Sequence, residues 1–307
     1  MSLRDYAGMA RPDHWFKNVF ILPGVLIAAL LTKTPWTAFW PQFLEGLASA
    51  CLIASSNYVI NEWIDAEFDR FHPVKKNRPA VQRRVSGRGV LLEYVLTAAC
   101  GLALAWQVSK GFFAVSAAFL AAGVLYNVRP FRLKDRVYAD VLVESINNPI
   151  RLLLGWFMVT EAVLPPSSLV LAYWMGGAFL MGIKRYSELR YIGKREAALY
   201  RKSFERYTED SLLISSFFYA LCSAFFLGVF LVKHRVELLI SFPFLALLFA
   251  WYLRLGMRPD SPAQHPEKLY REKEFFVFCL LLAALLIALL VWDVPALDWF
   301  LEGATIR

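Results

Sequence analysis

Charged residues, cysteine and histidine are all scarce in this chain. Only 19% of its 307 residues are charged, against about 25% in a typical soluble protein. The four cysteines, Cys51, Cys100, Cys222 and Cys279, lie far apart inside apolar runs, and the four histidines are equally scattered. No two cysteines have the spacing of metal ligands. These shortages argue against a disulfide scaffold, a zinc or haem centre, and a soluble domain.

Apolar residues are abundant instead. They make up 58% of the chain, and its mean hydropathy is +0.46. Nine apolar runs are long enough, or nearly so, to cross a bilayer; they cover residues 19–32, 43–60, 90–108, 111–126, 137–163, 169–183, 211–232, 236–255 and 275–292. The runs are continuous, and backbone groups in lipid must bond to one another, so helices are expected. The sequence predicts one integral membrane domain over residues 1–307, an all-α polytopic bundle of about nine transmembrane helices.

Lysine and arginine divide unevenly between the loops. With nine spans, one set comprises the N-terminus and residues 61–90, 127–139, 184–210 and 254–274, and it holds 27 of the 33 basic residues. The other set holds five, and Arg151 lies inside a span. Because basic loops stay in the cytoplasm, the first set is predicted to be cytoplasmic. Topology thus explains the net charge of +8, and no nucleic-acid partner is required.

A polar face leads out of the second apolar run. Asn57, Asn61, Asp65 and Asp69 are spaced by four residues, so they share one face of a helix. Adjacent carboxylates repel each other unless a cation lies between them. Hard oxygen ligands of this kind suit Mg²⁺, which keeps several waters and bridges to substrate phosphates. The pattern predicts a magnesium site at this helix end.

A basic loop follows the polar face. The helix is expected to stop before Pro73, and Lys75 and Arg78 come next, well placed to bind phosphate. Glu62 and Glu67 lie on other faces of the helix and are predicted to be solvated. The alternative interpretation is a solvated acidic helix end followed by a loop that is basic only for topology.

The fifth run carries a second polar stripe. Asp140, Glu144, Asn147 or Asn148, and Arg151 recur at helical spacing inside an otherwise apolar segment. Ionisable groups within a membrane span are costly and usually mark function. A water-filled cavity or a buried ion cluster explains the stripe. The alternative is an internal salt bridge between Glu144 and Arg151.

Further cations lie at the predicted cytoplasmic level. Lys17 precedes the first run, Lys134 follows the fourth run, which ends near Tyr126, and Lys184 and Arg185 follow the sixth. They are candidate ligands for an anionic substrate. Lys17 is explained equally well as an interfacial anchor, and the segment after Lys184 as a pair of solvated helices.

These motifs resemble those of the UbiA superfamily of intramembrane prenyltransferases. The first acidic motif of that family, Asn-Asp-x-x-Asp-x-x-x-Asp, is similar to NEWIDAEFD, with Asn61, Asp65 and Asp69 in place and Glu62 where the family has Asp. Within the superfamily the chain most resembles the decaprenyl-phosphate phosphoribosyltransferases. The matching segments are RPDHWFKN at 11–18, HPVKKNRP at 72–79, KRYSEL at 184–189, and the set Lys134, Asp140 and Arg151.

The resemblance implies a reaction. A Mg²⁺-dependent enzyme would transfer a phosphoribosyl group from 5-phosphoribosyl diphosphate to a polyprenyl phosphate, an isoprenoid lipid, with Asp65, Asp69 and Asp140 as catalytic carboxylates. The metal set would be Asn61, Asp65, Asp69 and Asp140. The residues expected to bind substrates are Lys17, Asn57, Lys75, Arg78, Tyr126, Lys134, Glu144, Arg151, Lys184 and Arg185.

Two other interpretations stay open. A UbiA-type prenyltransferase would use the same acids with a prenyl diphosphate donor and an aromatic or lipid acceptor. An ion-coupled transporter would use the polar stripe of the fifth run, although no inverted repeat accompanies it. In each case the protein is expected in the lipid bilayer of a bacterial inner membrane, and the enzyme's active site is expected to face the cytoplasm.

Overall fold

The computed structural model describes residues 3–72, 74–82, 84–259, 261–264 and 266–292, and in this part every regular element is a helix. The all-α prediction is confirmed. The α-helices are α1 (Leu3–Ala10), α2 (Leu22–Thr32), α3 (Trp40–Asp69), α4 (Gly87–Val108), α5 (Lys110–Asn127), α6 (Ala139–Ser145), α7 (Asn147–Val159), α8 (Ser167–Ile192), α9 (Lys194–Tyr200), α10 (Glu209–His234), α11 (Phe242–Gly256) and α12 (Lys273–Val291). Short 3₁₀ segments join several of them, including η1 (Pro12–Ile21), η5 (Lys202–Glu205) and η6 (Val236–Ser241).

Seven helical segments among the described residues are long and apolar enough to cross a membrane. They are Leu3–Thr32, Trp40–Asp69, Gly87–Val108, Lys110–Asn127, Glu209–His234, Val236–Gly256 and Lys273–Val291. The protein is therefore an integral membrane protein, but the predicted number of nine is not reached by this measure. The predicted fifth span is divided between α6 and α7, of 7 and 13 residues, and the last turns of α8 carry Lys184, Arg185 and Glu188.

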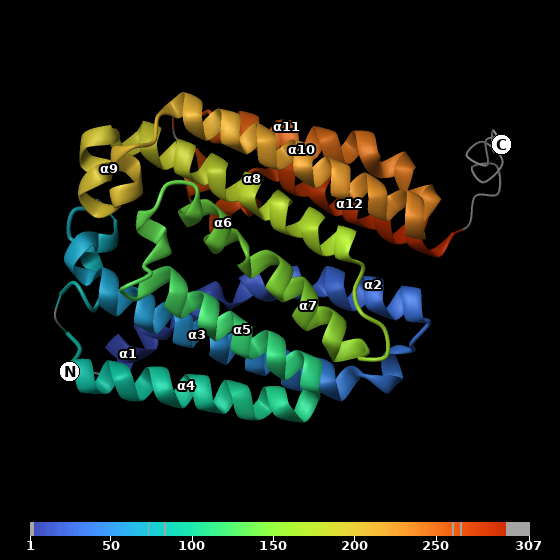
Figure 1. Ribbon diagram of the computed structural model, residues 1–307, viewed down its shortest axis with the longest axis horizontal. Coiled ribbons are helices and arrows are strands. Elements are labelled where there is room, and N and C mark those ends of the chain that lie inside the picture. Colours follow the sequence, from blue (N-terminus) through green and yellow to red (C-terminus); the bar gives the residue numbers. More distant parts are fainter. Residues whose placement is uncertain (1–2, 73, 83, 260, 265, 293–307) are drawn as a thin grey trace.

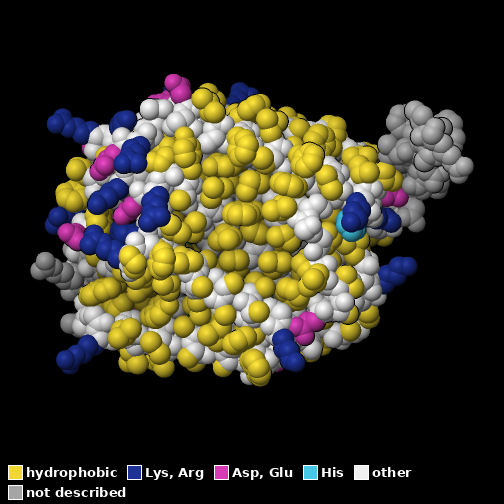
Figure 2. Space-filling model, in the orientation of Figure 1, with side chains coloured by type: hydrophobic (Ala, Val, Ile, Leu, Met, Phe, Trp, Pro, Cys, Tyr) yellow, Lys and Arg dark blue, Asp and Glu magenta, His cyan; other side chains and the backbone are white. Residues whose placement is uncertain are grey.

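The helices lie side by side along the long axis of the molecule, and the predicted cytoplasmic loops gather at one end (Figure 1). Most Lys and Arg side chains visible in Figure 2 also gather at that end, while apolar side chains cover the middle. Helix α1 begins at the basic end, and α12 ends at the opposite one. The clustering of the loops agrees with the predicted division; that this end faces the cytoplasm stays a prediction.

Two glycines let α2 and α7 pack with their backbones in contact. A Cβ atom on Gly24 would lie 2.0 Å from the carbonyl oxygen of Leu152, and one on Gly155 would lie 2.2 Å from that of Ile21. Small residues are the usual means of close helix approach in membranes. This contact sets α7, and with it the polar stripe, against the N-terminal segment.

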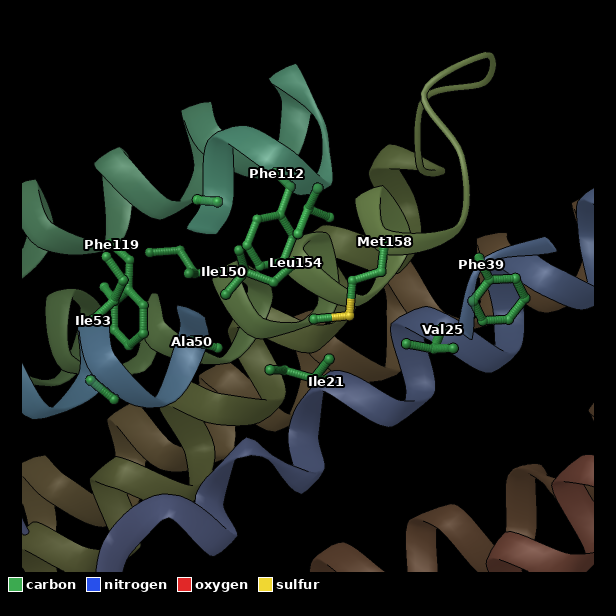
Figure 3. Close-up of a cluster of buried hydrophobic side chains, with 13 residues drawn as sticks. Ile21, Val25, Phe39, Ala50, Ile53, Phe112, Phe119, Ile150, Leu154 and Met158 are labelled. Carbon is green, nitrogen blue, oxygen red and sulfur yellow. The ribbon is translucent and has the colours of Figure 1, made fainter. Parts of the chain in front are cut away.

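The packing core beneath the polar end joins η1 and α2 with α3, α5 and α7 (Figure 3). Its buried side chains include Ile21, Val25, Ala50, Ile53, Phe112, Phe119, Ile150, Leu154 and Met158. Ala54 and Phe119 belong to this core and also line a polar cavity above it. The core therefore gives that cavity an apolar floor.

Candidate active site

A cavity of about 560 Å³ opens among the N-terminal segment, α3, α5, α6, α7 and α8. Its wall contains eight basic side chains: Arg11, Lys17, Lys75, Arg78, Arg151, Lys184, Arg185 and Arg201. Three carboxylates face them: Asp65, Glu144 and Glu188. The apolar part of the wall includes Ala54, Phe119, Ala122 and Val143. Such a cavity suits a ligand with several negative charges and an apolar tail.

Most residues predicted to bind substrates meet in this wall. Nine of the ten line it, namely Lys17, Asn57, Lys75, Arg78, Tyr126, Glu144, Arg151, Lys184 and Arg185. The tenth, Lys134, lies just behind the wall, where it contacts Asp65. The structure therefore brings together residues that are up to 168 positions apart in the chain.

Asn57, Asn61 and Asp65 line the cavity at intervals of one helical turn, as their spacing predicts. Asn57 Nδ2 donates to the carbonyl oxygen of Phe119 at 3.0 Å, and Asn61 Nδ2 donates to Asn127 Oδ1 at 2.5 Å. These bonds orient both amide oxygens. Asn57 Oδ1 is buried and has no hydrogen-bond partner among the described residues.

Asp65 is held by two cations from the loop after α5. Lys134 Nζ bonds to its Oδ1 atom, and Arg132 Nη2 lies 3.1 Å from the same atom. Lys134 Nζ also donates to Asn127 Oδ1 at 2.8 Å. Burial lowers the pKa of Lys134 to about 8, although Asp65 acts to raise it. The cations neutralise a carboxylate that would otherwise be costly beside an apolar core.

Asp69 lies one turn further along α3 but outside the cavity wall. Its side chain is buried, Arg78 Nη1 donates to its Oδ2 atom at 2.5 Å, and Lys75 Nζ lies 4.0 Å from Oδ1. Burial lowers the pKa of Lys75 to about 8, and Asp69 opposes the shift. Asp69 thus holds the basic loop in place, and the purely topological interpretation of that loop does not account for its contacts.

Glu62 and Glu67, near the C-terminal end of α3, have different surroundings. Glu67 is exposed, as predicted. The prediction of a solvated Glu62 is wrong: this side chain is buried and accepts a hydrogen bond of 3.4 Å from the backbone N–H of Ala80. The loop after α3 folds back over it, which its position on the helix did not reveal.

Oxygen donors for a metal ion are present but few are carboxylates. Within the described ranges, no three His, Cys, Asp or Glu side chains lie close enough together to hold a metal. Mg²⁺, however, usually binds through one or two carboxylates and the phosphates of the substrate. Asp65 with the amide oxygen of Asn61, one turn away on the same helix, fits that pattern.

Part of the polar stripe of the predicted fifth span lines the cavity, namely Glu144, Asn147 and Arg151. The span is broken at Ile146, where α6 ends and α7 begins, and Pro149 lies in the first turn of α7, where a missing N–H is tolerated. Asn147 lines the cavity. Asn148 instead packs against Gly177 of α8, where its Nδ2 atom lies 2.1 Å from the position that a Cβ on Gly177 would occupy.

Glu144 and Arg151 do not pair with each other. Glu144 bonds to Arg185 and accepts a hydrogen bond of 2.6 Å from the Tyr126 hydroxyl. Arg151 Nε donates to Asn18 Oδ1 at 3.2 Å. The alternative interpretation of the stripe as a Glu144–Arg151 salt bridge is therefore wrong.

Lys184 and Arg185 both line the cavity but differ in their surroundings. Arg185 is 1% exposed and is paired with Glu144 and, at 2.8 Å, with Glu188. Lys184 is half-buried, and no carboxylate pairs with it in the described part of the chain. Lys184 is therefore the member of the pair that can meet a ligand without giving up a protein partner.

Asp140 is not brought to the cavity. Its side chain is completely buried, and its oxygens accept hydrogen bonds from Tyr207 and Ser203. It is therefore held by protein groups and is not part of the lining that contains Asp65; its role as a metal ligand stays a prediction.

Several residues of the cavity wall were not predicted from the sequence to be part of the site. The His14 ring lies between Lys17, whose Nζ is 2.8 Å from Nδ1, and Arg11, which contacts Nε2. Tyr58 receives Arg11 over its ring at 5.7 Å. Arg201 also reaches the wall. His14 lies within the RPDHWFKN segment and Tyr58 follows Asn57, so motifs next to both residues could have pointed to them. No motif in the sequence marks Arg201.

The fold and this cavity define a membrane-embedded helical protein with a polar site rich in cationic side chains. The model of the UbiA prenyltransferase family matches residues 21–280. The chain belongs to the UbiA prenyltransferase family, whose members are membrane-embedded transferases. The interpretation as an ion-coupled transporter is thereby set aside.

The chain is also similar to individual proteins. The chain is 32% identical over 204 residues to nodulation protein NoeC of Azorhizobium caulinodans, covering 65% of this chain and 62% of that protein. It is 30% identical over 209 residues to decaprenyl-phosphate phosphoribosyltransferase of Mycolicibacterium smegmatis, covering 66% and 62%. The chain thus spans less than two thirds of these relatives' length.

The fold has solved neighbours. A UbiA homolog from Archaeoglobus fulgidus bound to GPP and Mg²⁺ superposes with a TM-score of 0.71 at 20% identity, over 94% of this chain and 100% of that one. At this identity the likeness concerns the fold alone.

Proposed function

We propose that this protein transfers a phosphoribosyl group from 5-phosphoribosyl diphosphate to a polyprenyl phosphate at the cytoplasmic face of a bacterial inner membrane. The main support is the surplus of positive charge in the cavity wall, which contains eight Lys and Arg side chains and three carboxylates. A prenyl diphosphate brings one anionic head. Phosphoribosyl diphosphate brings two, and the lipid phosphate adds a third. The 30% identity to a decaprenyl-phosphate phosphoribosyltransferase supports the same choice.

The cations come from separate parts of the chain, which suits a donor with charge at both ends. Arg11 and Lys17 approach from the N-terminal segment, and Lys184 and Arg201 from α8 and the segment after α9. Charge-assisted contacts to phosphate are about twice as strong as neutral hydrogen bonds. One group would hold the diphosphate and the other the 5-phosphate of the ribose.

A magnesium ion would be held by Asp65 together with the amide oxygen of Asn61, one turn away on α3, and by the donor's phosphates. When bound, Mg²⁺ neutralises the charge that develops on a departing diphosphate. Asp69 keeps Arg78 in the wall through their 2.5 Å hydrogen bond. The carboxylate of Asp65 must leave Lys134 or share it, and Lys134 would then be available for a phosphate oxygen.

The reaction needs no strong base. A phosphate oxygen of the lipid attacks C1 of the ribose and forms a new C–O bond. The C1–O bond to the diphosphate breaks, and its electron pair leaves with the diphosphate. The acceptor phosphate is already ionised at neutral pH, so no proton has to be removed. Ala54, Phe119 and Val143 would contact the isoprenoid chain beside the reacting phosphate.

The second candidate is transfer of a prenyl group from a prenyl diphosphate to an aromatic or lipid acceptor. The apolar floor formed by Ala54 and Phe119 is equally compatible with it, because the isoprenoid of a prenyl diphosphate would fit there as well. The metal site does not distinguish the candidates, since both donors release diphosphate.

A donor screen with purified protein separates them. Phosphoribosyl diphosphate with polyprenyl phosphate is compared with prenyl diphosphates and aromatic acceptors, each with and without Mg²⁺, and Asp65→Asn serves as the inactive control. We expect a Mg²⁺-dependent lipid product from the first mixture alone. Product from prenyl diphosphates alone would replace the proposal by the second candidate.

A further inference from the structure

Asp140 is a completely buried carboxylate with a full set of protein partners. Tyr207 Oη donates to Oδ1 at 2.6 Å, and Ser203 Oγ donates to Oδ2 at 3.0 Å. Arg185 Nε and Arg201 Nη1 lie 3.5 and 3.7 Å from Oδ2 and compensate the charge. A buried ion with both hydrogen bonds and counter-ions in place is satisfied without any ligand.

Three of these four partners come from one segment, residues 194–207, which comprises α9, η5 and the residues beside them. The segment lies at the basic end of the molecule, next to the end of α8 (Figure 1). Its Ala197, Tyr200, Phe204 and Tyr207 pack into a buried cluster with Tyr186 and Leu189 of α8. Asp140 of α6 is thus the polar anchor of a segment that α8 holds by apolar contacts.

Arg201 is the residue that this anchor delivers to the cavity. It lies between α9 and η5 in an extended conformation, lines the wall, and donates from Nη1 to the Tyr126 hydroxyl at 3.0 Å. The two residues that bond to Asp140, Ser203 and Tyr207, lie two and six positions further along. Fixing them fixes the start of η5 and therefore the direction of Arg201.

The Tyr207 hydroxyl also acts on α6 itself. It accepts a hydrogen bond of 2.7 Å from the backbone N–H of Tyr138 while it donates to Asp140. Tyr138 has φ +64°, a conformation that residues with side chains rarely adopt, so its surroundings must hold it there. Burial and the neighbouring Asp140 raise the pKa of the Tyr207 phenol, which keeps this donor protonated.

We propose that Asp140 is a positioning residue that clamps the 194–207 segment through Tyr207 and Ser203 and so places Arg201 against the donor's anionic group. The role of Arg201 toward a donor rests on the proposed function. The clamp itself does not, because it is a property of the protein without substrate.

Tyr207→Phe tests the clamp with the least disturbance. It removes one hydroxyl, keeps the ring in its cluster, and leaves every charge near Asp140 unchanged. Ser203→Ala removes the other donor. Glu205→Gln is the matched control, because Glu205 lies on the same 3₁₀ turn but is exposed. Backbone hydrogen exchange of residues 194–207 is measured in detergent-purified protein without substrate or metal, and steady-state kinetics are measured alongside it.

Exchange in the 194–207 segment should rise about tenfold in Tyr207→Phe, the equivalent of one lost hydrogen bond, and stay at the wild-type level in Glu205→Gln. The Michaelis constant for the donor should rise with little change in kcat or in the Mg²⁺ concentration for half-activation. Arg201→Gln should raise it similarly, and adding Tyr207→Phe should have little further effect.

Unchanged exchange in both Tyr207→Phe and Ser203→Ala would overturn the clamp. So would an Asp140→Asn protein that needs far more Mg²⁺ while its 194–207 segment exchanges normally, since that result identifies a metal ligand. If the wild-type protein does not turn over phosphoribosyl diphosphate, the proposed function is wrong. The hydrogen-exchange measurement still tests the clamp, because it is made without substrate.

Discussion

Asp65 and Asp69 lie one turn apart on α3 and yet have different surroundings. Asp65 lines the cavity and is bonded to Lys134, whereas Asp69 is buried outside the wall and bonded to Arg78. Two carboxylates that the sequence presents as equivalent therefore have separate tasks. The first is available to a metal ion and a substrate, and the second orients a loop that supplies cations.

Replacing Asp65 by asparagine should abolish turnover and also lower stability. The change removes the carboxylate proposed for the metal, and it leaves the buried Lys134 without its anionic partner, at a cost of about 1–3 kcal/mol. Product formation and thermal unfolding in detergent measure the two effects. Glu67→Gln, an exposed change on the same helix, is the control. Near-normal Mg²⁺-dependent turnover in Asp65→Asn would show that this residue does not hold the metal.

Alanine substitutions of Lys184 and Arg185 should affect different properties, donor binding and stability respectively. Lys184→Ala should fold normally and raise the Michaelis constant for phosphoribosyl diphosphate by about 10- to 150-fold, the value of one charge-assisted contact. Arg185→Ala should lose about 3–5 kcal/mol of stability, because it leaves buried carboxylates unpaired. Thermal unfolding and donor titration of both variants provide the test. A stable Arg185→Ala protein with selectively weakened donor binding would reverse the two assignments.

The contact between α2 and α7 should be intolerant of a single methyl group. Gly24→Ala places a Cβ on the Leu152 carbonyl oxygen, so the helices must separate, and we expect a loss of about 2 kcal/mol or more. Gly228→Ala is the matched control, because nothing lies within 4 Å of its Cβ position. Unfolding temperatures in detergent compare the two. Equal temperatures would mean that this interface adjusts at little cost.

Topology can be checked independently of activity. Reporter fusions or cysteine labelling in residues 61–90 and 184–210 should report the cytoplasm, because both lie at the basic end of the bundle. A reporter placed after α12 should report the opposite side; the predicted terminal position, Arg307, lies outside the described residues. A cytoplasmic reporter after α12 would contradict an odd number of crossings.

Periodicity predicted the parts of the site that depend on one helix. The four-residue spacing of Asn57, Asn61 and Asp65 places them on one face because a helix repeats every 3.6 residues. The same rule failed for Asp69, because helix geometry cannot tell where the following loop folds back. The burial of Glu62 was not predicted for the same reason.

The positions of residues that depend on the packing of several helices could not be predicted from the sequence. Arg201 reaches the wall only because the 194–207 segment packs on α8 and bonds to Asp140. The break at Ile146 divides a run that hydropathy presents as continuous. The partner of Glu144 proved to be Arg185, 41 positions away, rather than Arg151 on the same predicted helix.

Phosphoribosyl transfer is tested by diphosphate release from phosphoribosyl diphosphate by the purified protein, measured together with the mass of the lipid product. We expect release that requires both Mg²⁺ and polyprenyl phosphate, with one phosphoribosylated lipid formed for each diphosphate released. Lys184→Ala should need more donor for the same rate. Release from prenyl diphosphates only, with phosphoribosyl diphosphate left intact, would show that the protein is not a phosphoribosyltransferase.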